Sequence, residues 1–320
     1  MARDLEAGGP TAALVGDWPG SARTDAVSVR LAGALHAAAL SGRDAALAAL
    51  YPAAQPDADA DAVWAAARAF LVRERDWVAD FLRSPPQTNE PRRSIALLVG
   101  FLDLATRFKM PLDTLEIGAS AGLNLCWDRA AYRTASWSWG DPGTAPIETD
   151  WRGPTPQLGA EVRVRSRAAC DQNPLDLRSP EQLLRLRSYI WADQAERLAR
   201  FDEAVARALA QSVRVERADA ADWLEARLDA RASDALTVVY HSVFYQYPPR
   251  ATRERIAAAL ERAGKDGRAP LAWLRVEPEA ALGGPRESAR FLIDVIHWPG
   301  PERRTLGTTD GHVRFIDTSP

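Results

Sequence analysis

The run from Leu115 to Asn124 constrains the fold more than any other part of this sequence. It is Leu-Glu-Ile-Gly-Ala-Ser-Ala-Gly-Leu-Asn, in which a short apolar strand passes into a turn with glycines at 118 and 122. Glycine has no Cβ, so a ligand can approach its backbone closely, and free N–H groups at the start of a helix bind anionic or polar groups. We expect a strand, a ligand-binding turn and then a helix over residues 121–129.

The spacing of these glycines excludes two common phosphate-binding motifs. The spacing is Gly-x-x-x-Gly, with Ser120 where the dinucleotide motif Gly-x-Gly-x-x-Gly has its second glycine, and no Gly-Lys-Ser or Gly-Lys-Thr follows. The acidic residue at the end of the strand suits instead a ligand with an ammonium group, such as the methionine part of S-adenosylmethionine. The predicted cofactor-binding residues of this run are Glu116, Gly118, Ser120, Gly122 and Asn124. The alternative is a tight turn that binds no ligand.

The composition and the residue pattern of the chain change near residue 110, and this change predicts two regions. Residues 1–110 are rich in alanine and in helix signals, with helices expected over 27–50 (broken near Ser41 and Gly42), over 61–82, and through Phe108. Residues 111–320 alternate short β-branched or aromatic runs with helical stretches. This alternation is typical of a doubly wound α/β domain, here with seven mostly parallel strands.

The predicted strands lie between helical segments. The strands are expected at 114–117, 162–168, 213–216, 236–240, 272–276, 291–297 and 313–316, and the helices at 121–129, 180–210, 221–228 and 250–263. Residues 132–158 hold three tryptophans and several glycines and prolines, which favours a hairpin or lid inserted after the first helix.

Acidic residues follow the next two strands, where doubly wound folds hold a nucleoside. Asp171 is expected to accept hydrogen bonds from ribose hydroxyls, and Asp219 from the adenine amino group. The alternative is that Asp171 forms a local turn before Pro174 and that Asp219 caps the following helix. Asp141 is a second candidate for the ribose-binding acid.

Polar and aromatic residues follow the fourth strand, at the sheet edge where open α/β folds place chemistry. His241 and Tyr245 are the predicted catalytic residues, with His241 as a general base or a substrate-orienting group; the alternative is a structural histidine. Aromatic side chains are expected to enclose a sulfonium and an apolar substrate by cation–π attraction, or only to pack the insert. These predicted pocket residues are Trp127, Trp137, Trp139 and Tyr247.

Several of these motifs together resemble a bacterial family of uncharacterised proteins, domain of unknown function 2332. The resemblance rests on the run around Gly118, on Trp127-Asp128-Arg129 and on His241-Ser242, and it covers residues 25–316. Further matches are Thr88-Asn89-Glu90, Arg93-Ser94, Asp171-x-Asn173-Pro174-x-Asp176, Trp191-x-Asp193-Gln194 and Asp219-Ala220.

The resemblance implies a fold similar to the class I S-adenosylmethionine-dependent methyltransferases, with a helical N-terminal region. Against the general methyltransferase pattern, Ser120 replaces the usual middle glycine. The fourth strand also lacks the Asn/Asp-Pro-Pro-aromatic signature of amino-group methylation, so methylation of nucleic-acid bases is not expected. The expected function is S-adenosylmethionine binding with methyl transfer to an unknown small molecule. A non-catalytic nucleoside-binding protein of the same fold is the alternative.

A serine hydrolase is the third interpretation, because residues 118–122 also fit Gly-x-Ser-x-Gly. Ser120 would then be the nucleophile, with Asp219 or Glu277 as the acid and His297 or His312 as the base. The nucleophile turn of α/β-hydrolases follows several strands, whereas the residues before 110 are predicted to be helical. The context therefore disfavours this interpretation.

The composition of the chain limits which classes of binding partner are expected. The 320 residues carry 40 Lys and Arg against 43 Asp and Glu, so no overall charge attracts nucleic acid or an anionic membrane. The longest apolar runs are shorter than a membrane span, and the N-terminus lacks the pattern of a secretory signal. Two cysteines and four scattered histidines predict no metal site. We expect a cytoplasmic protein with a small-molecule substrate.

Overall fold

The computed structural model describes residues 1–319 and divides into two compact units. The first comprises Met1–Thr88 and Asp176–Asp202, and the second comprises Asn89–Leu175 and Glu203–Pro320. The boundary predicted near residue 110 therefore lies earlier, because the helix before it is part of the α/β core. A second correction is that a later segment of the chain, Asp176–Asp202, returns to the helical unit.

The first unit is helical. Its apolar core includes Leu31, Phe70 and Leu82. Tyr189 also belongs to this core, and its ring lies where a Cβ on Gly33 would be 2.6 Å from the nearest ring atom, so only glycine fits there. Its helices are α1 (Ala2–Glu6), α2 (Pro10–Val15), α3 (Val27–Leu40), α4 (Ala45–Leu50), α5 (Ala60–Arg73), α6 (Arg75–Leu82) and α8 (Pro180–Ser188), and α9 (Ala195–Ala210) begins in it.

Two predicted long helices are each divided in two. The break near Ser41 and Gly42 is confirmed, but the single helix expected over 61–82 is interrupted at Glu74, where the backbone leaves helical angles (φ −111°, ψ 31°). The helix expected over 180–210 is also wrong, because α8 ends before Tyr189, whose side chain turns into the core. Burial of a large side chain here outweighs the local preference for helix.

The second unit is built on one mixed sheet of nine strands rather than seven mostly parallel ones. Five strands are parallel, and taken in chain order they are arranged as third, second, first, fourth and fifth, the doubly wound order. They are β7 (Glu216–Arg217), β6 (Val164–Asp171), β1 (Leu112–Ile117), β8 (Leu236–Ser242) and β9 (Leu271–Pro278). The crossovers reverse direction between β1 and β8, where such folds bind ligands.

The other four strands extend the sheet beyond β9. In spatial order they are β10 (Phe291–Trp298), β11 (Glu302–Thr309), β12 (Phe315–Asp317) and β5 (Asp150–Arg152). β10, β11 and β12 pair antiparallel with their predecessors, whereas β5 pairs parallel with β12. β11 and β5 were not predicted, because their charged and exposed residues do not give an apolar strand pattern.

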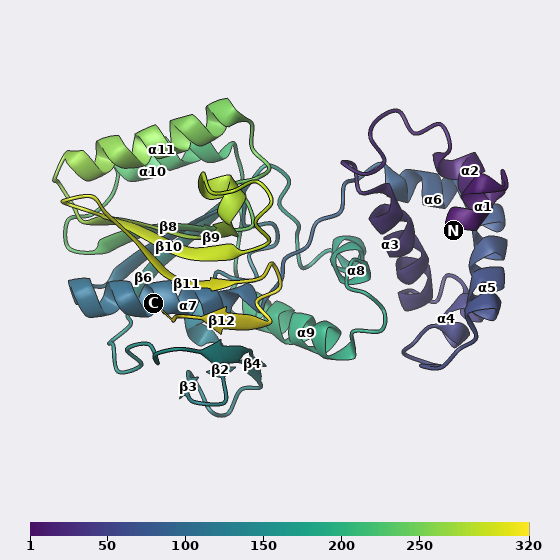
Figure 1. Ribbon diagram of the computed structural model, residues 1–320, viewed down its shortest axis with the longest axis horizontal. Helices are drawn as coiled ribbons and strands as arrows, with labels where there is room; N and C mark the ends of the chain where they lie inside the picture. Colours follow the sequence, from purple (N-terminus) through teal and green to yellow (C-terminus); the bar gives the residue numbers. More distant parts are fainter. Residues whose placement is uncertain (320) are drawn as a thin grey trace. The chain divides into compact units, whose positions relative to one another are not determined.

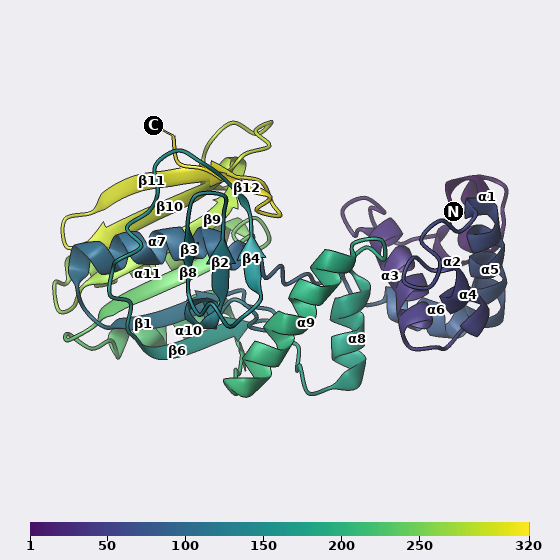
Figure 2. The ribbon, with the colours of Figure 1, turned by 90° about the horizontal axis from the view of Figure 1, so that it is seen from below.

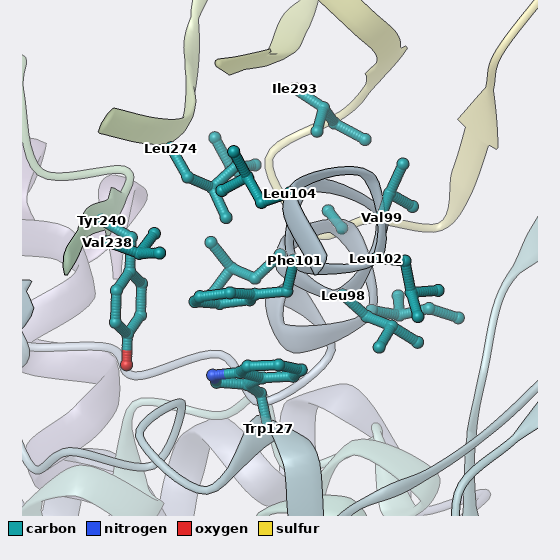
Figure 3. Packing of buried hydrophobic residues seen from close by; sticks show 14 of the residues in the cluster. Leu98, Val99, Phe101, Leu102, Leu104, Trp127, Val238, Tyr240, Leu274 and Ile293 are labelled. Carbon is teal, nitrogen blue, oxygen red and sulfur yellow. The ribbon is translucent and has the colours of Figure 1, made fainter. Parts of the chain in front are cut away.

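Helices cover both faces of this sheet (Figure 1). α10 (Ala220–Asp229) and α11 (Arg250–Lys265) lie on one face, and α7 (Arg93–Phe108) lies on the other. In α7 the apolar residues recur three and four apart, so the helix buries one side against Leu274 and Ile293 of the sheet and another against Trp127 (Figure 3). Gly100 of α7 permits this approach, since a Cβ there would lie 2.2 Å from Leu274.

The predicted insert packs onto α7, on the side away from the main sheet (Figures 1 and 2). It forms a small sheet in which β2 (Ala131–Arg133) lies between β3 (Ser138–Trp139) and β4 (Pro146–Glu148). Trp137 and Trp139 join the apolar core around Trp127. The insert therefore contributes to the hydrophobic core of the unit. Short 3₁₀ helices occur at Trp127–Arg129 and Glu279–Leu282.

Within residues 1–319, none of the helices combines the length and apolarity needed to cross a membrane.

Candidate functional site

The turn after β1 has an unusual backbone. Gly118, Ser120 and Gly122 all have positive φ, at 68°, 55° and 76°. A positive φ is unfavourable for serine, so this conformation is held by its surroundings. Positive φ values at every second residue are incompatible with a helix. The helix predicted over 121–129 is therefore wrong, and within that range only the short 3₁₀ turn at Trp127–Arg129 forms.

Hydrogen bonds from neighbouring elements fix this turn. The Ser120 N–H donates to Asp171 Oδ2 at 2.9 Å, and the Ser120 carbonyl accepts from the Leu175 N–H at 3.2 Å. The Leu123 N–H, which a helix would have used, donates to Asn89 Oδ1 at 2.9 Å. The turn is thus built into the fold.

Glu116 is buried at the carboxyl end of β1, beside the turn. Only 2% of its surface is exposed, and its Oε2 accepts a hydrogen bond from the Tyr240 hydroxyl at 3.2 Å. Burial raises the pKa of Glu116 from 4.5 to about 8, the Tyr240 hydrogen bond lowers it, and the charge of Asp171 raises it. A neighbouring cation would reverse this shift, because it would stabilise the carboxylate.

Four buried polar atoms around this turn have no hydrogen-bond partner in residues 1–319. They are the Ser120 Oγ, both amide atoms of Asn124, and the Trp127 Nε1. Buried polar groups are normally paired, so such a cluster indicates where a ligand or water completes the hydrogen bonding. Asn124 and Trp127 are each only 1% exposed.

Aromatic stacking connects Trp127 to Glu116. The Trp127 ring stacks on Phe101 with centroids 3.8 Å apart, and Phe101 meets the Tyr240 ring edge-on at 5.2 Å. Figure 3 shows the indole nitrogen of Trp127 at the end of the ring nearer to Tyr240. The unpartnered indole, the Tyr240 hydroxyl and the Glu116 carboxyl therefore belong to one region at the carboxyl end of β1.

Each of the predicted nucleoside-binding acids accepts hydrogen bonds from backbone N–H groups. Asp171 accepts from the Ser120 and Asn173 N–H groups, at 2.9 and 2.8 Å, and Asp219 caps α10 by accepting from Ala221 and Asp222. Asp141 lies in the insert, is exposed, and accepts from the Gly143 N–H. Of the three acids, Asp171 is the one that bonds to the Gly118 turn.

His241 is fully buried and both its ring nitrogens are engaged. Its Nε2 accepts a hydrogen bond from Trp273 Nε1 at 3.0 Å, so this nitrogen carries no proton, and its Nδ1 lies 2.6 Å from Glu277 Oε1. Tyr245 stacks on His241 and donates its hydroxyl hydrogen to the Arg253 carbonyl. His241 therefore has no free nitrogen to act as a general base, which favours the structural alternative, and the Tyr245 hydroxyl hydrogen is also engaged.

The predicted pocket aromatics are dispersed. Trp139 stacks on Trp127 at 6.5 Å, Trp137 meets Trp151 edge-on, and both belong to the packing of the insert. Tyr247 is 73% exposed. Trp127 and Trp137 each have a buried indole nitrogen without a partner in residues 1–319, and of the two Trp127 is connected through Phe101 to Tyr240.

The groups needed for a serine hydrolase are not brought together. Over residues 1–319 the Ser120 Oγ has no hydrogen-bond partner, so no histidine activates it. His297 lies 3.4 Å from Glu302 and meets Phe108 edge-on, and His312 lies 3.7 Å from Glu90.

Three residues that shape the site were missed as site residues by the sequence analysis. Asn89 holds the turn, Tyr240 bonds Glu116, and Phe244 packs its ring on Gly118. A signal existed for Glu277, which with Arg275 is one of two charged residues in a mostly apolar, buried strand, although it was considered only as a hydrolase acid. Asn89 was named only within the motif Thr88-Asn89-Glu90, and that motif does not reveal its partner, which lies 34 residues away.

Comparison with known proteins identifies the family. Residues 1–318 match the family described as "Uncharacterized protein conserved in bacteria (DUF2332)". Comparison with curated proteins finds no significant match. Among solved structures, the chain is similar to one titled "DhpI-SAM-HEP complex", with 9% identity, 71% of this chain and 72% of that chain covered, and a TM-score of 0.25. A TM-score this low carries no weight for fold or function.

Proposed function

We propose that this chain, which belongs to the bacterial family DUF2332, binds S-adenosylmethionine at the carboxyl end of β1 and transfers its methyl group to a small molecule. One observation carries the proposal: a buried carboxyl and four unpartnered buried polar atoms surround a glycine-containing turn at the topological switch point of a doubly wound sheet. Such folds bind ligands at this place.

The residues present fit the chemistry of this cofactor. Glu116 would bind the ammonium group, which replaces the solvation that burial has removed from its carboxyl. The Ser120 hydroxyl and the Asn124 amide, both without partners in residues 1–319, supply donors and acceptors for a carboxylate and for hydroxyls. Asp171 and Asp219 are partly exposed and retain lone pairs for ribose and adenine groups.

The chain's own residues would contribute alignment. Bound S-adenosylmethionine supplies an activated methyl group on a sulfonium, which is a good leaving group. Methyl transfer of this kind requires the acceptor to be held in line, and correct orientation provides most of the acceleration. The lack of a free nitrogen on His241 is compatible with an acceptor that needs no base.

The second candidate function is nucleoside binding without methyl transfer, and the hydrogen bonding after β8 favours it. His241, Tyr245 and the backbone that follows β8 are all bonded to one another or to the core, at the position where an acceptor would meet a catalytic group. A protein that binds the nucleoside without transferring a methyl group would need nothing more at this place. This candidate shares the binding site and differs only in the chemistry.

Titration calorimetry with S-adenosylmethionine and S-adenosylhomocysteine tests the binding. Because the pKa of Glu116 is about 8 and the ligand carries an ammonium group, binding near pH 7 should release a proton. The apparent binding enthalpy should therefore depend on the ionisation enthalpy of the buffer. Glu116→Gln should remove that dependence, while Tyr247→Ala, which changes an exposed ring, should not.

The outcomes separate the candidates. No binding at millimolar concentrations of either compound would refute both. Binding of both compounds, with methylation of a small-molecule extract by labelled S-adenosylmethionine, supports the transferase. Binding with no labelled product would favour the non-catalytic protein.

A further inference from the structure

The segment after β8 begins with a strained residue. Val243 has a φ of 53°, and a β-branched side chain in the left-handed region is a rare outlier. Its N–H donates to the Val276 carbonyl at 2.9 Å, which holds this conformation. Strain of this kind persists only where surrounding contacts impose it, and it concentrates at functional sites.

A buried carboxylate fixes the next residue. The Phe244 N–H donates to Glu277 Oε1 at 2.8 Å, and the same oxygen lies 2.6 Å from His241 Nδ1. Glu277 and His241 are fully buried, and Trp273 fixes the other side of the imidazole. The backbone of Phe244 is thus held in place by the Glu277 carboxylate, which is not part of the proposed binding site.

The Phe244 ring packs against Gly118 of the proposed ligand-binding turn. A Cβ built on Gly118 would lie 2.1 Å from Phe244 Cδ2 and 2.6 Å from Cγ, so the ring fills the space that this glycine leaves open. The Phe244 ring is half-buried, and its residue belongs to a loop with no strand pairing. Turning the ring away from Gly118 would break side-chain contacts, among them the edge-on contact with His241, but no hydrogen bond between strands.

We propose that Phe244 is a removable plug, which occupies the space beside Gly118 until a ligand displaces it, and that Glu277 and His241 are the positioning residues that hold it there. This inference rests on the proposed function, because it concerns access to the same site. A protein whose binding-competent state is a minority binds more weakly by the fraction that is competent. The plug therefore lowers both the affinity and the association rate.

Stopped-flow and calorimetric measurements with S-adenosylhomocysteine test the plug. If the unplugged state is about a tenth of the population, Phe244→Ala should raise the association rate constant and the affinity about tenfold, with Phe244→Leu in between. Glu277→Gln replaces a charge-assisted hydrogen bond to the Phe244 N–H by a weaker neutral one. It should shift both quantities in the same direction by about two- to threefold. Tyr247→Ala, on the same loop, is the matched control and should change neither.

The alternative is that Phe244 is a fixed wall that contacts the ligand. Phe244→Ala would then weaken binding, and this result, or an unchanged affinity, overturns the plug while leaving the proposed function intact. If neither the natural protein nor Phe244→Ala binds S-adenosylhomocysteine, the proposed function and the plug both fail. Melting curves of each variant establish that the comparison is made on folded protein.

Discussion

Two buried carboxyl groups lie near the carboxyl ends of two strands of the same sheet, and their surroundings differ. Glu116, at the end of β1, has one hydrogen bond from Tyr240 and lies in a region with four unpartnered polar atoms. Glu277, near the end of β9, has one oxygen that serves both His241 and the Phe244 backbone, and a second oxygen without a partner. The first region leaves hydrogen-bonding capacity for a ligand, whereas the second uses most of it for structure.

The same sequence rule predicted ligand-binding residues in both regions, and the structure shows different hydrogen bonding in each. Polar residues at the carboxyl ends of parallel strands are expected to bind ligands. The rule does not say whether such residues are already bonded to one another. His241 satisfies the rule by position and fails it by chemistry, because both its nitrogens are engaged.

The largest loss of stability is expected when Glu277 is replaced. Glu277→Ala removes the partner of His241 and of the Phe244 N–H, and loss of one member of a buried pair costs about 3–5 kcal/mol. Urea denaturation should show this loss. Glu277→Gln, which retains an acceptor oxygen, should lose clearly less. A loss below about 1 kcal/mol for Glu277→Ala would show that the pair does not hold this end of the sheet.

The pH dependence of stability should distinguish Glu116. Its pKa is about 8 in the folded protein and 4.5 ordinarily, so between these values the folded state binds more protons than the unfolded state. The contribution of Glu116 to the free energy of unfolding is therefore complete below about pH 4.5 and is lost as the pH rises through 8.

Glu116→Gln cannot ionise and provides the reference. The unfolding free energy of the natural protein relative to Glu116→Gln should fall with rising pH by at most about 1.4 kcal/mol per pH unit. Denaturation series at pH 5, 6, 7 and 8 measure this difference. A constant difference across the series would mean that the Glu116 carboxyl is already ionised.

Two buried asparagines offer a matched pair. Asn89 accepts from the Leu123 N–H, whereas neither amide atom of Asn124 has a partner in residues 1–319. Asn89→Leu should destabilise by about 1–3 kcal/mol, because it leaves a buried N–H unpaired. Asn124→Leu should stabilise by about 1 kcal/mol and weaken S-adenosylhomocysteine binding. Equal losses of stability in both variants would show that Asn124 is structural.

Most of the sheet was predictable, and the parts that were not have physical reasons. The strands β8, β9 and β10 are mostly apolar, whereas β1 and β6 mix apolar with charged residues, and all five overlap the ranges predicted from the sequence. The helix expected after Gly122 fails because bonds to Asn89 and Asp171, both distant in sequence, impose a left-handed backbone. Such long-range contacts outweigh local preference, and no single window of the sequence shows them.

The same limitation applies to the candidate site. Glu116, Ser120 and Asn124 were predicted from one continuous run, and all three are buried in the structure. Trp137 and Trp139 were expected to line a pocket, but an aromatic cluster in an insert is equally suited to pack against a neighbouring helix. The structure shows this packing, with Trp139 against Trp127. Composition alone does not distinguish a lining from a core.

The smallest effect should come from Asp171, where the ligand-binding and structural interpretations remain to be separated. Each of its oxygens accepts one backbone N–H, from Ser120 and Asn173. Asp171→Asn retains one acceptor and should cost about 1 kcal/mol of stability. Asp219→Asn is the control, because both of its capping bonds use a single oxygen, which asparagine also has.

The ligand series then decides the role of Asp171. If it also binds ribose, Asp171→Asn should weaken S-adenosylhomocysteine binding further, by about 1–3 kcal/mol, and should affect a 2′-deoxy analogue less. If it only holds the turn, the two ligands should lose affinity equally, since both depend on the same Ser120 backbone. The difference between the two losses, measured by calorimetry, therefore reports a contact to the ribose hydroxyl without contribution from the turn.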